Sequence, residues 1–553
     1  MRKPLLAALL CPFSICGAFA QIQLSYTGSG SDDSPAINAL IGSTAAAASN
    51  KTITITGPIR LRTAIRIPTG TKNLNIIGRG PTGGRAPVSV MASTAIFVIG
   101  RYDFSVTSPA PLSNLAAMDI KAPGEGQDTI TIRSPKGLNT GWYVVYDDQS
   151  VTHNSYPSTI FHNAMLVKVL SFDKKRALAI LDRPLNRAYT KAPKMAYVEG
   201  QVTENITIRG FELDGRVPGS TTGVGGFVAG GFVVGFQGLD LKARYCSSGI
   251  LKLGVSRDFL FDGIDIADST GNLAAGGEGY GIYILRSQNG LIRNSRAATM
   301  RHGFVMHSGT TDVIIENSVG LSTVGSDFDV HGMDERRITF RYCSGTSIGI
   351  GNDAWNKGGS GHRVENCDVG TIYIGPTTSG SVVDSSFVRA FDGLDGRNVL
   401  VGSRPGLPVG QWTFDNCHFQ GTRRLLMFLN DKVVQGLTFR NCSWLSQGSV
   451  FEAYQISGNL SFDQNTFEGG NMWDGSMLHF SSQSGVPLHV KLTNSTFRSG
   501  TAGYAVGLGG APFNGSVELG DNVFYSTVAV AFHRAQDPYM SLTLYRNHVW
   551  RTP

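Results

Sequence analysis

Acidic, basic and aromatic side chains recur at alternate positions of short, repeated segments between residues 251 and 331. They are Lys252, Tyr283, His307, Asp329 and His331. Histidine titrates near neutral pH and can accept or release a proton, tyrosine can donate a proton, and lysine attracts anions. Brought together, these residue types would form an acid–base site. The next question is which elements position them.

The five residues stand in short segments where apolar residues occupy every second place. The segments are Leu251–Leu253, Ile282–Arg286, Phe304–His307, Phe328–His331 and Ile348–Gly351. Successive side chains of a strand point to opposite faces. The pattern therefore predicts that Ile282, Phe304, Phe328 and Ile348 point inward, as do Ile284, Met306, Val330 and Ile350. The five polar residues then point outward on one face, which is either a functional strip or a solvent face without a function.

A short sequence repeat, called the phrase below, explains why such strands are expected to stack on one another. An apolar residue, a polar residue and a turn residue recur twelve times from Phe261-Asp262-Gly263 to Leu544-Tyr545-Arg546, and the turn residues lie 19 to 31 residues apart. A regular repeat of this length indicates a stacked coil in which each turn contacts only its neighbours. Parallel strands would lie about 4.8 Å apart along it. His307 and His331, 24 residues apart, would be neighbours on successive coils.

Two positions of the phrase predict a ladder at each corner. The turn position holds Asn294, Asn317, Asn366, Asn416, Asn441 and Asn494. We expect their amides to bond backbone groups that the turn leaves unpaired. The following position holds Cys343, Cys367, Cys417 and Cys442, which predicts small buried thiols inside the coil rather than disulfides.

Further residues flank the strip. Arg301 and His302 precede one of its strands, Arg286 follows another, and Asp353, Trp355 and Tyr373 come next along the chain. We expect Lys252, Arg286, Asp353, Trp355 and Tyr373 to bind substrate. We expect Arg301 and His302 to belong to the catalytic residues. Two alternatives stay open: His302 bonds a turn, and Arg301 pairs with Glu278 or Glu316.

The start of the chain indicates export. Met1–Ala20 has a short cationic beginning, an apolar stretch and an Ala-x-Ala-like end, which is typical of a secretory signal peptide. A secreted or periplasmic protein is expected, with no membrane partner after cleavage. Five cysteines remain beyond residue 20, an odd number that rules out a complete disulfide framework. Removing Arg2 and Lys3 lowers the formal charge from +7 to +5, which is compatible with a polyanionic substrate.

The distribution of the repeated sequence pattern divides the rest of the chain into three segments. Residues 21–114 are expected to form an N-terminal cap and the first coils, and a helix beginning near Asp32-Asp33-Ser34-Pro35 would cover the open strand edge. Residues 115–200 change to alternating strands without the coil phrase, which predicts an inserted β subdomain. Residues 201–553 would form the main coil.

These features together resemble the pectate-lyase-like right-handed parallel β-helices, which include secreted polysaccharide lyases and phage tailspike depolymerases. The resemblance rests on the Asp32-Asp33-x-x-Ala36-Ile37 opening, the Asn-bearing coils and the inserted β segment. It implies an all-β, right-handed, single-stranded parallel β-helix with an N-terminal capping helix and a small inserted β subdomain. It also implies a polysaccharide as partner, no nucleic acid, and a monomer or a homotrimer. The fold hosts several chemistries.

Two motifs narrow the chemistry that the resemblance implies. Arg301-His302-Gly303 is similar to the Arg-His-Gly string of β-helical alginate and chondroitin lyases, although the Lys expected one coil earlier is absent. Asp329-Val330-His331 is similar to the Asp-Pro-His motif of mannuronan C5-epimerases, with Val330 in place of Pro. Both families remove the proton beside a uronate carboxylate, so a lyase acting by β-elimination is expected.

The implied roles can be assigned residue by residue. His331 would be the base, oriented by Asp329 or assisted by His307. Arg301 and Lys252 would neutralise the carboxylate, and Tyr283 would be the acid. Asp353, Trp355 and Tyr373 would contact the sugars, and no cofactor is expected.

Other functions stay open. A uronan C5-epimerase would use the same residues. A glycoside hydrolase would need two carboxylates, and Asp327 and Asp329 lie about 6.6 Å apart along one strand. The same pair could instead hold a calcium ion. A non-catalytic carbohydrate-binding or exopolysaccharide-assembly protein would use none of this chemistry.

Overall fold

The computed structural model describes most of the chain. The described ranges are 21–45, 50–91, 95–101, 112, 115–133, 138–150, 160–221, 223–273, 278–322, 324–332, 334–351, 359–375, 380–389, 399–401, 409–421, 426–428, 432–446, 450–469, 476–482, 486–499, 504–508, 513–525 and 540–550.

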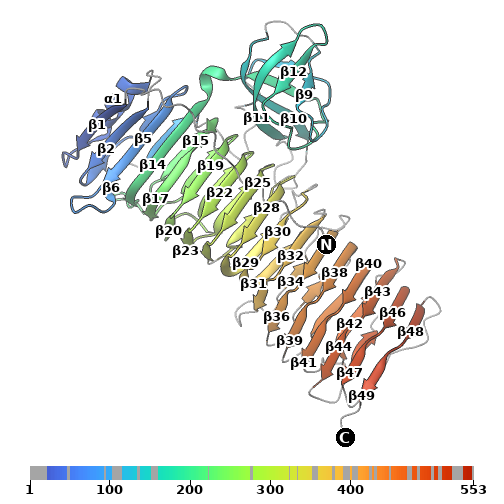
Figure 1. Ribbon diagram of the computed structural model, residues 1–553. Coiled ribbons are helices and arrows are strands. Elements are labelled where there is room, and N and C mark those ends of the chain that lie inside the picture. Colours follow the sequence, from blue (N-terminus) through green and yellow to red (C-terminus); the bar gives the residue numbers. More distant parts are fainter. Residues whose placement is uncertain are drawn as a thin grey trace.

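The strands wind into a parallel β-helix, which confirms the predicted stacked coil (Figure 1). Each full coil contributes one strand to each of three parallel sheets, which we call sheets I, II and III. The strands of sheet I are β1 (Ile22–Thr27), β2 (Lys51–Thr56), β5 (Lys72–Arg79), the first part of β14 (Thr203–Asp214), β16 (Val233–Val234), the first part of β17 (Gln237–Arg244), β19 (Arg257–Asp262), β22 (Gln288–Arg293), β25 (Thr311–Glu316), β28 (Arg336–Arg341), β30 (Arg363–Glu365), β32 (Ser381–Asp384), β35 (Val409–Asp415), β38 (Lys432–Arg440), the end of β40 (Phe451–Asp463), β43 (Leu488–Thr493), β46 (Gly515–Gly520) and β48 (Met540–Tyr545).

Sheets II and III follow the corners of each coil. Sheet II contains β3 (Ile59–Leu61), β6 (Ala86–Val90), the ends of β14 and β17, β20 (Asp265–Ala267), β23 (Arg296–Ala298), β26 (Val319–Leu321), the beginnings of β29 (Ser344–Ile350) and β31 (Asp368–Ile374), β33 (Phe387–Arg389), β36 (His418–Gly421), β39 (Ser443–Ser446), β41 (Thr466–Gly469), β44 (Thr496–Ser499), β47 (Val523–Tyr525) and β49 (His548–Trp550). Sheet III contains β4 (Ile65–Ile67), β7 (Phe97–Gly100), β15 (Val228–Gly231), β18 (Leu251–Gly254), β21 (Tyr280–Leu285), β24 (His302–His307), β27 (Phe328–Val330), the ends of β29 and β31, β34 (Val399–Val401), β37 (Leu426–Phe428), the beginning of β40, β42 (Ser476–Ser482) and β45 (Tyr504–Leu508).

The turn residue of the repeated phrase has a left-handed backbone in all twelve copies, with φ between 46° and 67°. Asparagine tolerates this conformation better than most residues, which explains its frequency there. For Asn294, Asn416, Asn441 and Asn494, the expected bonds to the backbone are replaced by bonds to an aspartate of the preceding coil. Asn294 Nδ2 donates to Asp262 Oδ1 over 2.8 Å, and Asn494 Nδ2 donates to Asp463 Oδ1 over 2.8 Å.

The next position of the phrase provides the inner ladder. Cys246, Cys343, Cys367, Cys417 and Cys442 are buried there or near it and are free, as predicted. Asn465 and Asn522 occupy the same inner position in later coils. Their amides donate to Phe439 O and Leu492 O over 2.9 and 3.0 Å. The backbone-bonding ladder therefore exists one residue further along than expected.

A helix and a second sheet complete the described residues. Helix α1 (Ser34–Ala45) buries Ile37 and Ile41 in the apolar core at one end of the stack, and a short 3₁₀ helix, η1, spans Glu199–Gln201. Six strands form a separate antiparallel sheet beside the coils (Figure 1). They are β8 (Ala117–Asp119), β9 (Thr129–Thr131), β10 (Gly141–Ser150), β11 (Ile160–Asp173), β12 (Leu178–Leu181) and β13 (Lys194–Tyr197).

Candidate active site

Strands β21, β24, β27 and β29 stack in register in sheet III. Ile282, Phe304, Phe328 and Ile348 are successive partners, and all four are fully buried in the coil. The predicted inward residues are therefore confirmed. The outward column of the same strands consists of Lys252, Tyr283, Val305, Asp329, Gly349 and Tyr373.

His307 and His331 lie side by side in the next outward column. The backbone N–H of His331 donates to Met306 O over 3.2 Å, which extends the register of β27 by one residue. The centroids of the two imidazole rings are 4.8 Å apart. The expected contact between neighbouring coils is present.

These histidines belong to a cluster of five rings outside the coil. The ring centroids of Tyr280, Tyr283, His302, His307 and His331 lie between 4.8 and 6.0 Å from their neighbours in the cluster. Each of the five residues is at most 8% exposed. The outward strip is therefore largely shielded from water, unlike an ordinary solvent face.

Asp329 is the centre of this cluster. Its Oδ2 accepts from Nδ1 of His302 over 2.9 Å and also from Nδ1 of His331. In the described part of the chain no donor reaches Oδ1. Burial raises the pKa of the Asp329 carboxyl, but the charges and hydrogen bonds of His331 and His302 outweigh burial and hold that pKa well below its usual value. Asp329 is therefore an anion.

The carboxylate selects one tautomer of the neighbouring histidine. Because Oδ2 of Asp329 accepts from Nδ1 of His331, the Nδ1 atom carries the proton and Nε2 is the basic nitrogen. An aspartate that orients an imidazole in this way prepares it to act as a general base. Nδ1 of His302 lies within reach of two acceptors, Ser326 O at 3.1 Å and Asp329 Oδ2 at 2.9 Å.

His307 has a different environment. Its Nδ1 lies 2.5 Å from Ser308 Oγ. Burial, His331 and Arg286 together hold the pKa of His307 well below its usual value. His307 is therefore a neutral imidazole at neutral pH.

Glu335 is a buried carboxyl group next to the histidines. A Cβ atom added at Gly332 would lie 2.7 Å from Glu335 Oε1 and 3.0 Å from His307 Nδ1. Glu335 Oε1 accepts from the N–H of Gly309 over 3.0 Å. Burial raises the pKa of Glu335 to about 7. Sequence reasoning missed this residue because it lies in a turn, where strand alternation does not predict direction.

Two cations face the rings. Burial and the nearby Arg286 lower the pKa of Lys252 to about 8. The Lys252 Nζ lies 5.5 Å from the centroid of the Tyr283 ring. Arg286 is 3% exposed, and burial lowers its pKa to about 10. Both residues were expected to bind substrate, and both lie at the cluster.

Tyr283 carries a buried hydroxyl group without a described hydrogen-bond partner. Burial and the adjacent Tyr280 raise the pKa of Tyr283 well above its usual value. The hydroxyl therefore keeps its proton at neutral pH and can donate it only to a stronger base, such as an alkoxide formed in a reaction.

Other predicted site residues lie elsewhere. Arg301 donates from Nη1 to Leu273 O over 3.3 Å, at the end of β24 opposite His307. The alternative that Arg301 pairs with Glu278 or Glu316 is not supported among the described residues, where Glu278 accepts from the Asn272 N–H over 2.7 Å and Glu316 pairs with Arg341 over 2.5 Å. Asp353 and Trp355 lie outside the described residues.

The prediction that Asp327 stands beside Asp329 on the outer face is wrong. Asp327 is fully buried, and its Oδ2 accepts from the Thr346 hydroxyl over 2.8 Å and from the Ser347 N–H over 3.2 Å. A Cβ atom at Gly320 would lie 2.3 Å from Asp327 Cβ, so the side chain occupies the space that the glycine leaves. The carboxylate stabilises a corner of the coil and does not join Asp329 on the outer face.

The antiparallel sheet contacts the coil directly behind the site. Arg187 is fully buried, and its guanidinium donates to Asn163 Oδ1 over 2.8 Å, to Asp334 Oδ2 over 3.1 Å and to Gly309 O over 2.5 Å. The N–H of Gly309 binds Glu335, and Asp334 directly precedes Glu335 in the chain. The segment 115–200 thus reaches the candidate site through one arginine, which the sequence did not indicate.

Comparisons with known proteins bear on the fold. No protein-family model and no curated protein matches the chain. The tailspike protein gp49 of Pseudomonas phage LKA1 is 14% identical, with a TM-score of 0.53 over 89% of this chain and 74% of that one. The gp54 tailspike of Acinetobacter baumannii bacteriophage AP22, solved with a capsular saccharide, is 11% identical, with a TM-score of 0.49 over 92% and 76%. The first likeness supports the expected β-helix architecture and nothing further.

Among the described residues, no cluster of three or more His, Cys, Asp or Glu side chains is suited to a metal ion. No described helix has the length and apolar character needed to cross a membrane.

Proposed function

We propose that this chain is an exported lyase that cleaves a uronate-containing polysaccharide by β-elimination. One observation carries the proposal. On a single outward face, a carboxylate-oriented histidine lies with a buried tyrosine hydroxyl and two desolvated cations, Lys252 and Arg286. The motifs Arg301-His302-Gly303 and Asp329-Val330-His331, which resemble those of uronate-active enzymes, support the same chemistry.

The reaction assigns one step to each group. Lys252 and Arg286 bind the uronate carboxylate and stabilise the negative charge that develops beside it. His331 Nε2 removes the proton at C5, and the electrons of that bond form the C4–C5 double bond. The C4–O bond breaks, and the leaving oxygen takes the proton of Tyr283. The products are a chain with an unsaturated uronate and a chain with a new reducing end.

The surroundings suit these roles. Asp329 stabilises the positive charge that His331 acquires when it removes the proton. The low pKa of His307 keeps that ring neutral, so it does not repel the protonated His331. Shielding from water strengthens the attraction between the two cations and the substrate carboxylate.

The test is an assay with polymers of different charge. Purified protein is given polyuronates, a glycosaminoglycan and a neutral glucan, and near-ultraviolet absorbance and chain length are followed. We expect absorbance and shortening with an acidic polymer, and loss of both in His331→Ala. His548→Ala, which removes an exposed histidine on the last coil, serves as the matched control. Unchanged activity of His331→Ala would exclude the mechanism.

Two other reactions are supported by particular groups. A C5-epimerase would use His331 and return a proton to the opposite face, changing sugar composition without shortening the polymer. A hydrolase would use Asp329, which is ionised, and Glu335, whose pKa is raised to about 7, as base and acid. Hydrolysis would shorten the chain without the absorbance, and Glu335→Gln would then abolish activity.

A further inference from the structure

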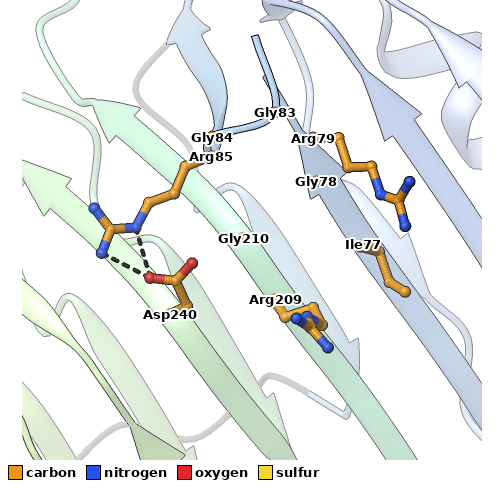
Figure 2. Close-up of a pocket in the computed structure, with 9 residues that line it drawn as sticks. All are labelled: Ile77, Gly78, Arg79, Gly83, Gly84, Arg85, Arg209, Gly210 and Asp240. Atoms are coloured by element: carbon orange, nitrogen blue, oxygen red, sulfur yellow. Dashed lines mark hydrogen bonds and ion pairs between the residues drawn. The ribbon is translucent and has the colours of Figure 1, made fainter. Parts of the chain in front are cut away.

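A second group of cations lies in a pocket of about 440 Å³ at the corner between sheets I and II (Figure 2). The end of β5 provides Arg79, the turn after it provides Arg85, β14 provides Arg209, and β17 provides Asp240. This pocket belongs to earlier coils than the histidine cluster and to a different face of the β-helix.

The pocket holds more positive than negative charge. Arg85 is fixed by Asp240, because its Nε donates to Oδ1 over 2.9 Å and its Nη2 lies 2.7 Å from the same oxygen. Figure 2 shows this pair on one wall. Arg79 and Arg209 are exposed, and no described carboxylate pairs with either. Three arginines and one aspartate leave a net charge of +2 among the lining residues (3 − 1 = 2).

The neighbouring sequence reinforces this charge. Residues 34 to 101 contain eight lysines and arginines and no aspartate or glutamate. Arg79 and Arg85 belong to that stretch. Carboxylates outside the stretch cancel part of this charge, since Lys72 pairs with Glu204 over 2.6 Å and Arg85 with Asp240 over 2.7 Å, but an anion still meets a net positive lining at the pocket.

Apart from the side chain of Ile77, the walls between the arginines are glycine backbone (Figure 2). A Cβ atom at Gly78 would lie 2.4 Å from Gly210 O, so glycine allows these two corners to pack closely and leaves the pocket without side chains there. A guanidinium matches the two oxygens of a carboxylate. Two exposed guanidiniums above bare backbone suit a flat, carboxylate-bearing sugar.

We propose that the pocket lined by Arg79 and Arg209 is an accessory binding site for a carboxylate-bearing polysaccharide. The identity of the ligand rests on the proposed function. Because the pocket and the histidine cluster lie on different coils and faces, one sugar unit cannot contact both. A long polymer bound at the pocket would raise the effective concentration of its other segments at the cluster.

The test measures binding and turnover separately. The full chain and the double variant Arg79→Gln/Arg209→Gln are titrated with a long polyuronate, using His331→Ala as background so that the polymer stays intact. Arg440→Gln/Arg546→Gln removes two exposed arginine charges from distant coils and is the matched control. We expect the pocket variant to bind at least about tenfold more weakly, and the control variant to bind as the parent does.

Turnover distinguishes this proposal from the proposed function. In the chain that retains His331, the pocket variant should raise KM for the long polymer and leave kcat unchanged. For a tetrasaccharide, KM should stay unchanged as well. Equal binding by pocket and control variants would overturn the accessory site, and so would equally arginine-dependent binding of duplex DNA. Absence of unsaturated products with normal polyuronate binding would overturn only the lyase.

Discussion

The coils that contain β21, β24 and β27 carry two outward faces of different chemistry. On sheet I, one column alternates in charge from coil to coil through Asp262, Arg293, Glu316, Arg341 and Glu365. Arg293 and Asp262 are 2.7 Å apart and partly exposed. On sheet III, the same coils place histidines, tyrosines and Asp329 at 1 to 8% exposure.

The charged groups of the two faces differ in burial, and this difference distinguishes structural residues from candidate catalytic residues. Exposed ion pairs between neighbouring coils are solvated and contribute little to stability. Burying ionisable groups costs free energy, so a protein that places them together on an outer face is using them for something other than folding. Both faces belong to the same coils and therefore share strand geometry and coil length. The buried ionisable side chains on sheet III, which the charged column of sheet I lacks, indicate the candidate active site.

The largest expected effect comes from Asp329→Asn. An amide in place of the Asp329 carboxylate does not fix the proton on Nδ1 of His331. The tautomer protonated at Nε2, which cannot accept a proton there, would then face the substrate. We expect turnover to fall by about 10³- to 10⁴-fold, with the β-sheet circular dichroism unchanged. The matched variant on sheet I, Asp262→Asn, should retain wild-type turnover. Similar losses in both would show that the two faces do not differ in function.

Arg187→Met should give the largest loss of stability. Asp334 keeps its pair with Arg336, whose Nε lies 2.7 Å from Oδ1, but the buried guanidinium bonds to Asn163 Oδ1, Asp334 Oδ2 and Gly309 O are all lost. We expect the free energy of unfolding to fall by about 3–5 kcal/mol in denaturant titrations. Arg183→Met, which breaks the more exposed pair with Asp258, should cost about 1 kcal/mol or less. An equally small loss for both would mean that burial does not distinguish these pairs.

Glu335→Gln tests the buried carboxyl through pH. The folded pKa of about 7 lies above the ordinary value of 4.5, so between these values the folded state binds more protons than the unfolded state. Stability from this group is complete below about pH 4.5 and is lost as pH rises towards 7, by up to about 3 kcal/mol. Denaturation across this range should show that slope in the wild type and a flatter curve in the variant. If the variant showed the same slope of stability against pH, another titratable group would be responsible for that slope.

Much of the fold and the centre of the site follow from periodicity alone. Alternation of two and a repeat near 25 residues predict which side chains face inward and which neighbour one another, as Phe304 over Phe328 and His307 beside His331 demonstrate. These are local rules applied to parallel strands in register. They held for the inward residues of β21, β24, β27 and β29.

The errors lie where strands end. Asp327 precedes β27 and turns into a corner next to Gly320, and Glu335 follows β27 and turns towards His307. A residue in a turn takes its direction from backbone angles and from the space left by distant residues. The contact of Arg187 with Asp334 joins residues 147 positions apart, and no periodicity reports on such a pair.

The smallest effect is expected on the sheet I face itself. Arg341→Gln removes a cation that lies 2.5 Å from Glu316 with 39% of its side chain exposed. Water and salt screen this pair, so its loss should lower the free energy of unfolding by about 0.2–1 kcal/mol and less at high salt. Urea denaturation at two salt concentrations measures this. A loss near that of Arg187→Met would mean that the charge ladder holds the coils together, and the absence of such a ladder on sheet III would then require a structural explanation as well as a functional one.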